Sequence, residues 1–178
     1  MARVSLIEAD GHPELADLIG KISGARRGRL INVYKLLLHS PALAESWFAH
    51  NNAVRWKTSL DGRLREMVIV RIGFLTRVAY IVGQHVPALA IPEGLTLEEC
   101  EALKDWQGSA LFGARDRAVL GYADAMTRDI QVPGAVFAEL KPWFDERQLV
   151  ELTILIGTYN MHARVMQALE IDPEKPAA

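Results

Sequence analysis

The sequence predicts an all-α, single-domain helical bundle. Signals for strands are weak, whereas leucine, alanine and aromatic residues recur at helical spacings of three and four along most of the 178 residues. Half of the residues are apolar and 24% are charged, which is the balance of a folded domain and not of a disordered chain. This length suits one domain. We expect an N-terminal segment with a short helix (1–29), a helical domain (30–170) and a solvent-exposed tail (171–178).

Eight helices are expected within the main domain, and capping residues and prolines mark several of their ends. Their ranges are 30–39, 41–57, 61–75, 77–89, 96–107, 114–130, 133–144 and 146–169. The third helix (61–75) is apolar around most of its circumference, which predicts a buried central helix.

Local signals define the ends and the shape of two of these helices. Thr76 is expected to cap the helix that follows it, and Thr96 has capping-box spacing to Glu99. Pro87 lies inside the helix over 77–89, where it removes a backbone hydrogen bond and presses on the carbonyl of Gly83. We expect a bend there, with room made by the missing side chain of Gly83.

Charge and cysteine content exclude several classes of protein. Twenty basic and 22 acidic side chains give a net charge of −2, so there is no surplus of cations for a nucleic-acid partner. No apolar run approaches the roughly 18 residues that span a bilayer, and the first residues lack the apolar core of a signal peptide. Cys100 is the single cysteine and cannot form an internal disulfide. We therefore expect a cytoplasmic protein without membrane or nucleic-acid partners.

Two helical stretches, 67–75 and 149–169, are more apolar than a monomer of this size requires. Together with four tryptophans and nine other aromatic residues, they predict that the chain forms a homo-oligomer.

The chain contains no glycine-rich phosphate loop and no CxxC, HExxH or GxSxG motif. We expect neither a metal ion nor an organic cofactor, so chemistry must depend on isolated side chains. Cys100 lies between Glu99 and Glu101, and the local negative charge makes it a poor nucleophile.

Three residues are the candidates for a catalytic role: Glu66, Tyr80 and His85. Glu66 precedes an apolar stretch, where a buried carboxyl group can exchange protons near neutral pH; alternatively it forms a salt bridge with Arg63, Arg71 or another arginine. His85 is a candidate proton shuttle or simply a core or surface histidine. Tyr80 can donate a hydrogen bond to an oxyanion, or it closes the core with its hydroxyl at the edge.

The segments around these residues resemble the carboxymuconolactone decarboxylase family, which includes the alkylhydroperoxidase D-like proteins. The resemblance rests on Leu64-Arg-Glu-Met-Val-Ile-Val-Arg-Ile-Gly-Phe-Leu-Thr, on Ala79-Tyr-Ile-Val-Gly-Gln-His-Val-Pro and on Gly94-Leu-Thr-Leu-Glu-Glu-Cys-Glu-Ala-Leu. The segment Leu149-Val-Glu-Leu-Thr-Ile-Leu-Ile-Gly-Thr-Tyr-Asn-Met-His-Ala-Arg is similar to the last helix of many members. Membership implies an all-α fold that assembles as trimers, hexamers or dimers.

Departures from the family pattern narrow the expected function. Peroxidase members carry a CxxC pair at positions that Val78 and Ile81 occupy here, so thiol peroxidase activity is disfavoured. Decarboxylase-like members show Glu-Tyr-Glu-Trp before the histidine, and of these residues only Tyr80 is kept. Glu66 then remains as the family acid that can orient His85. A helix N-terminus beside Val78 and Ile81 is expected to add partial positive charge to an apolar pocket.

The resemblance and these residues lead to three hypotheses about function. The first is a cofactor-independent lyase, decarboxylase or isomerase acting on a small carboxylated or lactone-like metabolite. In it, His85 is the general acid/base, Glu66 its partner and Tyr80 a hydrogen-bond donor. The second is a non-catalytic relative that binds a ligand or serves as a structural oligomer. The third, peroxidase-like activity, rests on family association alone.

Overall fold

The computed structural model describes residues 2–26 and 28–174. Over these residues the chain forms helices joined by turns, with no β-strand, which confirms the predicted all-α class. The α-helices are α1 (Ala16–Gly24), α2 (Asn32–Leu37), α3 (Pro41–Trp56), α4 (Gly62–Thr76), α5 (Ala79–His85), α6 (Leu97–Ala102), α7 (Ala114–Arg128), α8 (Gly134–Ala138) and α9 (Glu146–Ala168). Short 3₁₀ turns are η1 (Ala9–Gly11), η2 (Pro13–Leu15) and η4 (Leu103–Gly108), and a π turn, η3 (Val86–Ala90), follows α5.

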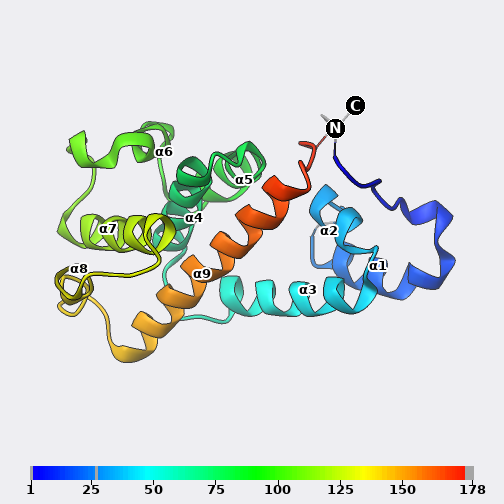
Figure 1. Cartoon of the computed structure of the whole chain (residues 1–178), viewed down its shortest axis with the longest axis horizontal. Coiled ribbons are helices and arrows are strands. Elements are labelled where there is room, and N and C mark those ends of the chain that lie inside the picture. Colours follow the sequence, from blue (N-terminus) through cyan, green and yellow to red (C-terminus); the bar gives the residue numbers. More distant parts are fainter. Residues whose placement is uncertain (1, 27, 175–178) are drawn as a thin grey trace.

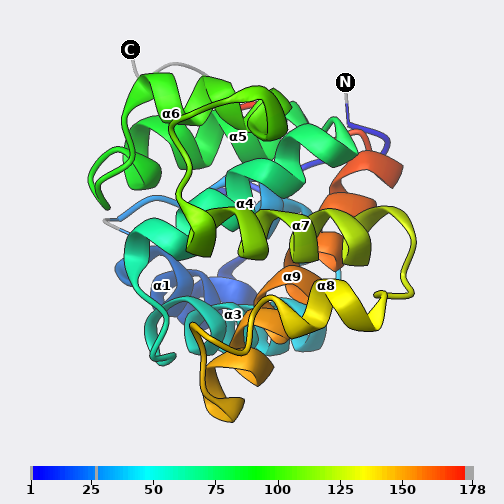
Figure 2. The same cartoon turned by 90° about the vertical axis from the view of Figure 1, so that its left-hand side faces the viewer.

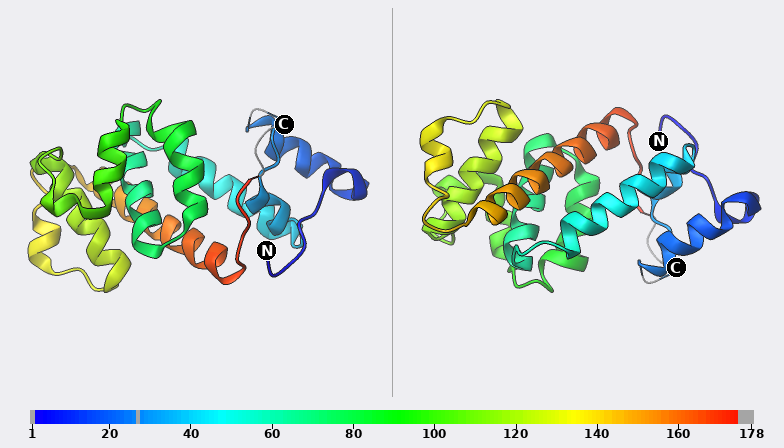
Figure 3. Two further views of the ribbon diagram at one scale, coloured as in Figure 1. Left: turned by 90° about the horizontal axis from the view of Figure 1, so that it is seen from above. Right: turned by 90° about the horizontal axis from the view of Figure 1, so that it is seen from below.

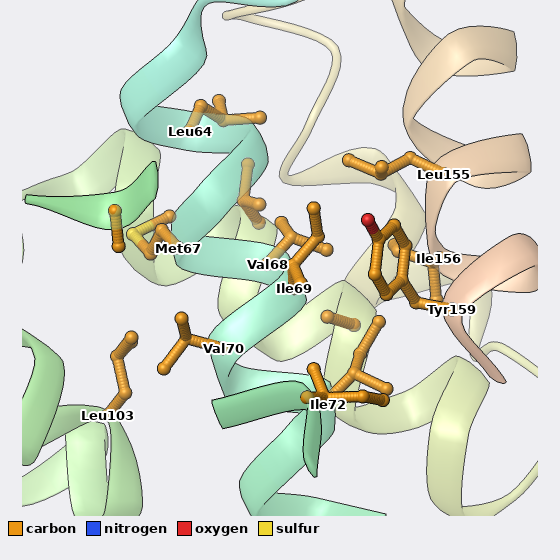
Figure 4. Close-up of a cluster of buried hydrophobic side chains, with 14 of the residues drawn as sticks. Leu64, Met67, Val68, Ile69, Val70, Ile72, Leu103, Leu155, Ile156 and Tyr159 are labelled. Carbon is orange, nitrogen blue, oxygen red and sulfur yellow. The ribbon is translucent and has the colours of Figure 1, made fainter. Parts of the chain in front are cut away.

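Helix α4 is the centre of the fold. Every residue from Leu64 to Gly73 is buried, and α5, α7 and α9 pack around this helix (Figures 1 and 2). In Figure 4, Val68 and Ile69 of α4 lie opposite Ile156 and Tyr159 of α9. The all-round burial confirms the prediction of a central helix and fixes α4 as the frame from which the site is built.

The buried Arg71 and the partly exposed Arg63 of α4 both pair with carboxylates of other elements. The guanidinium group of Arg71 donates to both carboxylate oxygens of Asp124, at 2.7 and 2.6 Å, and to the carbonyl of Leu103 at 2.7 Å. Arg63, nearer the start of α4, pairs with Glu99 and Asp116. Glu66 therefore does not pair with Arg63 or Arg71, but the alternative of a salt bridge with another arginine is confirmed, since Glu66 pairs with Arg65 and Arg55.

Helices α1 and α2 form the end of the molecule that lies farthest from α6, α7 and α8 (Figure 1). They pack a second, smaller apolar cluster made by Ile7, Leu15, Ile19, Leu38 and Ala44. The long helices α3 and α9 run alongside each other beneath α4 (Figure 3).

Of the two predicted capping residues, Thr96 is confirmed and Thr76 is not. The side chain of Thr96 accepts from the backbone N–H of Glu99, and the capping box at the start of α6 is complete. Thr76 does not cap the next helix: it is the last residue of α4, and its hydroxyl donates to the carbonyl of Ile72 at 2.7 Å. Arg77 then adopts a left-handed conformation with φ of 58°, which ends α4 and turns the chain toward α5.

The bend expected at Pro87 is present, but its cause is different. Residues Val86–Ala90 form a π turn, whose wider hydrogen-bonding pattern accommodates a residue that lacks an N–H. A side chain at Gly83 would meet no atom within 4 Å, so the expected role of this glycine in making room for the bend is wrong.

Other boundaries shift by a few residues, mostly where a helix ends in a 3₁₀ turn. The helix expected over 96–107 becomes α6 followed by η4, and the one over 133–144 shortens to α8. The tail expected to be solvated is also partly wrong. Within residues 171–174, Glu174 accepts a hydrogen bond from Tyr80, and the carbonyls of Asp172 and Pro173 accept from the side chain of Asn32. The rest of the tail, 175–178, lies outside the described residues.

Within the described ranges, no helix is both long and apolar enough to cross a bilayer. Helix α9 exposes Val150, Ile154 and Met161 at 63%, 48% and 41% of their surface. This exposed face accords with the expected homo-oligomer, which stays a prediction.

Candidate active site

The structure brings Glu66 and His85 into direct contact. Nδ1 of His85, the last residue of α5, lies 2.6 Å from Oε2 of Glu66, on the first half of α4. Glu66 has no exposed surface and His85 only 8%. The contact range expected from the sequence is therefore present between these two side chains.

Close approach of α4 and α5 makes this contact possible. A Cβ atom on Gly73 would lie 2.9 Å from Cγ2 of Val82 and 3.1 Å from Cγ2 of Ile81, so a glycine is needed where the two helices meet. Val82 and Ile81 precede His85 by about one turn, and their packing on Gly73 fixes the distance of His85 from α4.

Glu66 is ionised in this environment. Its other oxygen, Oε1, accepts from Arg55 at 3.2 Å and from Nε of Arg65 at 3.3 Å. Burial by itself raises the pKa of Glu66, but the hydrogen bond from His85 and the positive charges of Arg55 and Arg65 outweigh it and lower this pKa to about 2. Glu66 therefore stays a carboxylate at neutral pH, although it is sealed from water.

His85 is neutral, and its two nitrogens have different partners. Burial lowers the pKa of His85 below its ordinary value, although Glu66 acts in the opposite direction. Because a carboxylate only accepts, Nδ1 carries the proton and donates to Glu66. Nε2 is left with its lone pair and receives a long hydrogen bond of 3.4 Å from the hydroxyl of Tyr159. This arrangement gives an oriented imidazole whose Nε2 is unprotonated and basic.

A cavity of about 260 Å³ lies beside His85. Its lining includes residues of α3, α5 and α9 and the turn after α1, among them Tyr80, Tyr159 and His162. On one wall, the rings of Trp47 and His162 are stacked with centroids 4.4 Å apart and an angle of 15°. Tyr159 meets both His162 and His85 edge-on, so that an aromatic wall leads from Trp47 to the imidazole of His85.

Tyr80 lines the same cavity, but its hydroxyl is already engaged. It donates to Oε1 of Glu174 at 2.6 Å and accepts from the backbone N–H of Val33 at 3.4 Å. Burial and the neighbouring carboxylate of Glu174 raise the pKa of Tyr80. The predicted role of Tyr80 as a donor to substrate would require Glu174 to move, and it stays a prediction.

The sequence analysis did not identify Tyr159, Trp47, Arg55 or His162 as site residues. Tyr159 and His162 share a face of α9 at a spacing of three, and this was the one signal in the sequence that could have linked them to a common site. The approach of α3 and α9 to His85 depends on tertiary packing, which periodicity within each helix does not determine.

Val78 and Ile81 stand where the peroxidase members carry their CxxC pair, and the structure places the two residues differently. Ile81, in the first turn of α5, lines the cavity, whereas Val78, the N-cap residue of α5, is buried outside its lining. Cys100 is buried on α6 outside the lining. Burial raises the pKa of its thiol, and the negative charges of Glu99 and Glu101 raise it further. In the part of the chain that the structure describes, no three His, Cys, Asp or Glu residues are grouped so as to hold a metal ion.

The sequence pattern of the carboxymuconolactone decarboxylase family matches residues 41–125, a range that contains Glu66, Tyr80 and His85. The matched range is a little less than half of the 178 residues, and within it the chain resembles that family. The uncharacterized protein YnjA of Escherichia coli (strain K12) is 32% identical to it over 118 residues, which are 66% of this chain. The match spans 64% of the length of YnjA, less than two thirds of that protein.

Solved structures confirm the fold. An uncharacterized peroxidase-related protein from Silicibacter sp. TM1040 superposes with a TM-score of 0.83 and 23% identity, covering 97% of this chain and 92% of the other. The debrominase Bmp8, solved in complex with 2,3,4-tribromopyrrole, superposes with a TM-score of 0.80 and 17% identity, covering 96% of this chain and 91% of Bmp8. At these identities the likeness establishes the shared fold of this chain and not its activity.

Proposed function

We propose that this protein catalyses cofactor-independent proton transfer on a small carboxylated or lactone-like molecule, as a decarboxylase or other lyase, or as an isomerase. The observation that carries the proposal is the neutral His85, which lines the cavity, is oriented by the buried carboxylate of Glu66 and has an unprotonated second nitrogen whose one contact is the long hydrogen bond from Tyr159. A fixed base next to a mostly apolar cavity is the arrangement that removes a proton from carbon.

The chemistry needs only side chains of this chain. In an isomerisation, Nε2 of His85 takes a proton from a carbon next to a carbonyl group, and the electrons of the broken C–H bond move to the carbonyl oxygen. The imidazolium, stabilised by the charge of Glu66, then returns the proton to another carbon. In a decarboxylation, neutral His85 first takes the proton of the substrate's carboxylic acid. The C–C bond to the carboxylate then breaks, carbon dioxide leaves, and the bonding pair moves into the lactone carbonyl. The imidazolium returns its proton to carbon to form the new C–H bond.

Tyr159 is positioned to assist at the enolate oxygen. Its hydroxyl lies 3.4 Å from Nε2 of His85, and an oxygen atom of a substrate bound beside His85 would be within reach of the same hydroxyl. Burial raises the pKa of Tyr159, so this hydroxyl keeps its proton and acts as a donor.

The size of the cavity limits the substrate. A volume of about 260 Å³ lies just below the range of roughly 300–1,000 Å³ that holds drug-sized ligands, so the substrate has the dimensions of a small metabolite. The structural neighbour Bmp8 was solved with tribromopyrrole, a flat five-membered ring, and a lactone ring is of similar size. Peroxidase-like activity is not supported, because the one cysteine, Cys100, lies outside the cavity lining with a raised pKa.

Deuterium incorporation tests the proposal without knowledge of the natural substrate. A panel of unsaturated five-membered lactones that carry a carboxylate is incubated with the protein in D₂O and followed by NMR. We expect at least one compound to exchange a proton for deuterium or to release carbon dioxide, and His85→Ala to abolish this reaction. His50→Ala is the matched control, since His50 bonds Thr158 outside the cavity lining. If lactones bind and shift the His85 resonances without any exchange, the protein is a binding module and the proposal is wrong.

A further inference from the structure

Four buried polar atoms without a hydrogen-bond partner surround the same cavity. In residues 2–26 and 28–174, the buried side-chain nitrogen and oxygen atoms that lack a partner are Nε of Arg26, Oδ1 of Asn51, Nε of Arg55 and Nε2 of His162. All four of these residues line the cavity. Asn51, Arg55 and His162 are each more than nine-tenths buried, with exposures of 7%, 5% and 3%. An unsatisfied buried group costs about 1–3 kcal/mol, so their concentration at one cavity points to a ligand that bonds them.

The charge around the cavity is positive. Its lining includes Arg26, Arg29 and Arg55, and it includes no aspartate or glutamate. Arg55 is compensated by Glu66, which also pairs with Arg65. Arg26 bonds the hydroxyl of Tyr34 and lies over its ring, and among the described residues it has no carboxylate partner. Arg26, in the turn that follows α1, and the exposed Arg29 are therefore the lining cations without a carboxylate partner among the described residues, and of the two Arg26 is the more buried.

The wall next to these cations is flat and aromatic. Trp47 and His162 are stacked, and Tyr159 stands edge-on between His162 and His85. A planar ligand that lies along this wall has one edge near His85 and another near the arginine side chains. Guanidinium N–H groups match the geometry of a carboxylate better than that of other small polar groups.

We infer that Arg26 and Arg55 form an anion subsite in this cavity, where their Nε–H groups hold the carboxylate of a small planar acid whose ring lies against Trp47. The Nε2 atom of His162 borders the subsite, and Oδ1 of Asn51 accepts a hydrogen bond from a hydroxyl on the same ligand. The orientation of the acid toward His85 rests on the proposed function, whereas binding at the anion subsite does not.

Titration calorimetry with benzoate and with its neutral isostere benzamide tests the inference on the full chain. We expect the wild-type protein to bind benzoate at least about tenfold more tightly than benzamide, as a charge-assisted hydrogen bond provides. Arg26→Gln removes this preference and leaves benzamide binding unchanged. Lys21→Gln is the matched control: it deletes one positive charge on α1 outside the cavity lining, and it keeps the preference for benzoate.

A second variant covers the case in which Arg26→Gln fails to fold, since Arg26 also bonds Tyr34. Asn51→Asp keeps the size of the side chain and places a carboxylate in the cavity, so it weakens benzoate binding and leaves benzamide binding unchanged. His85→Ala is expected to bind benzoate as the wild type does, which separates the anion subsite from the proposed reaction. Equal affinity of the wild type for the two ligands, or an equal loss of both in Asn51→Asp, would overturn the inference.

Discussion

His85 and Glu66 meet across 2.6 Å from two different helices, although 19 residues separate them in the chain. Glu66 is completely enclosed, and it is held on its far side by Arg55 and Arg65. Of the side chains that bond this carboxylate, the imidazole is the one that can exchange a proton near neutral pH. Any proton that reaches this buried cluster from a substrate passes through Nε2 of His85, the nitrogen on the side of Tyr159.

The acid limb of the pH–rate profile should reflect this arrangement. Burial lowers the pKa of His85, so the neutral, basic form persists below the ordinary histidine value of about 6.5 and activity is lost only at lower pH. Glu66→Gln should lower the rate by about 10²- to 10⁴-fold because the imidazolium loses its counter-charge. It should also move the acid limb to still lower pH, since Glu66 opposes the effect of burial on His85.

Stopped assays of deuterium exchange between pH 4 and 8 measure both effects. Glu93→Gln is the matched control, because Glu93 pairs with the same Arg65 at 2.8 Å without touching His85. An unchanged rate and an unchanged limb in Glu66→Gln would show that the pair has no catalytic role.

Two tyrosines line the cavity, and the structure separates their expected contributions. Tyr80→Phe removes a hydroxyl that donates to Glu174, so we expect a loss of about 1 kcal/mol of stability and little change in kcat. Tyr159→Phe removes the hydroxyl beside Nε2 of His85, so we expect kcat to fall by about tenfold or more. Measurements of kcat and of the urea unfolding midpoint for the two variants show which tyrosine contributes to catalysis and which to stability. A larger loss of kcat in Tyr80→Phe would restore Tyr80 as the donor to substrate.

The helix crossing at Gly73 predicts an unusual response to alanine. Alanine normally stabilises a helix interior over glycine by about 1 kcal/mol, and Gly157→Ala on α9, where nothing lies within 4 Å, should show this gain. Gly73→Ala should instead destabilise by about 1–3 kcal/mol, because its Cβ meets Val82 at 2.9 Å. The same displacement moves His85 and should lower kcat. Urea unfolding of both variants provides the measurement, and a gain in stability at Gly73 would contradict the close crossing.

His162 makes the fold sensitive to acid. Burial lowers its pKa to about 3, whereas in the unfolded chain the value is about 6.5. Below pH 6.5 the unfolded state binds a proton that the folded state excludes, so stability is present above this pH and is lost as the pH falls toward 3. His162→Phe keeps an aromatic ring on Trp47 and removes this proton. Between pH 6 and 4 its free energy of unfolding should depend on pH less steeply, by up to about 1.4 kcal/mol per unit. If the free energies of unfolding of the wild type and of His162→Phe changed equally with pH, His162 would not be the source of the acid sensitivity.

Helical periodicity was sufficient to predict the class and the buried centre of this fold. The apolar circumference of α4 identified it as the core helix, and capping residues placed the start of α6. The helix predicted to start at residue 77 begins at Ala79 instead, because Arg77 adopts a left-handed conformation. Glycine and asparagine are the usual residues in that conformation, and neither is present at this position. Local signals therefore located helices better than they located the turns between them.

The site was predictable only along one stretch of the chain. Glu66 and His85 were found because they lie in consecutive helices within a recognisable segment. Arg26 lies in the turn after α1, Trp47 on α3 and Tyr159 on α9, and these residues meet at the cavity only after the three elements have packed. The hydroxyl of Tyr80 was expected to be available, but its pairing with Glu174 joins residues 94 positions apart.

The extremities of the described chain are fastened to each other next to the cavity. The backbone N–H of Ala2 donates to Asp172 at 2.9 Å, and Glu174, two residues further on, holds the hydroxyl of Tyr80. An affinity tag fused at either extremity would consequently pull on these contacts, one of which holds Tyr80 in the cavity lining. Recombinant preparations that differ only in tag placement should then differ in ligand affinity, and cleavage of the tag should make them alike.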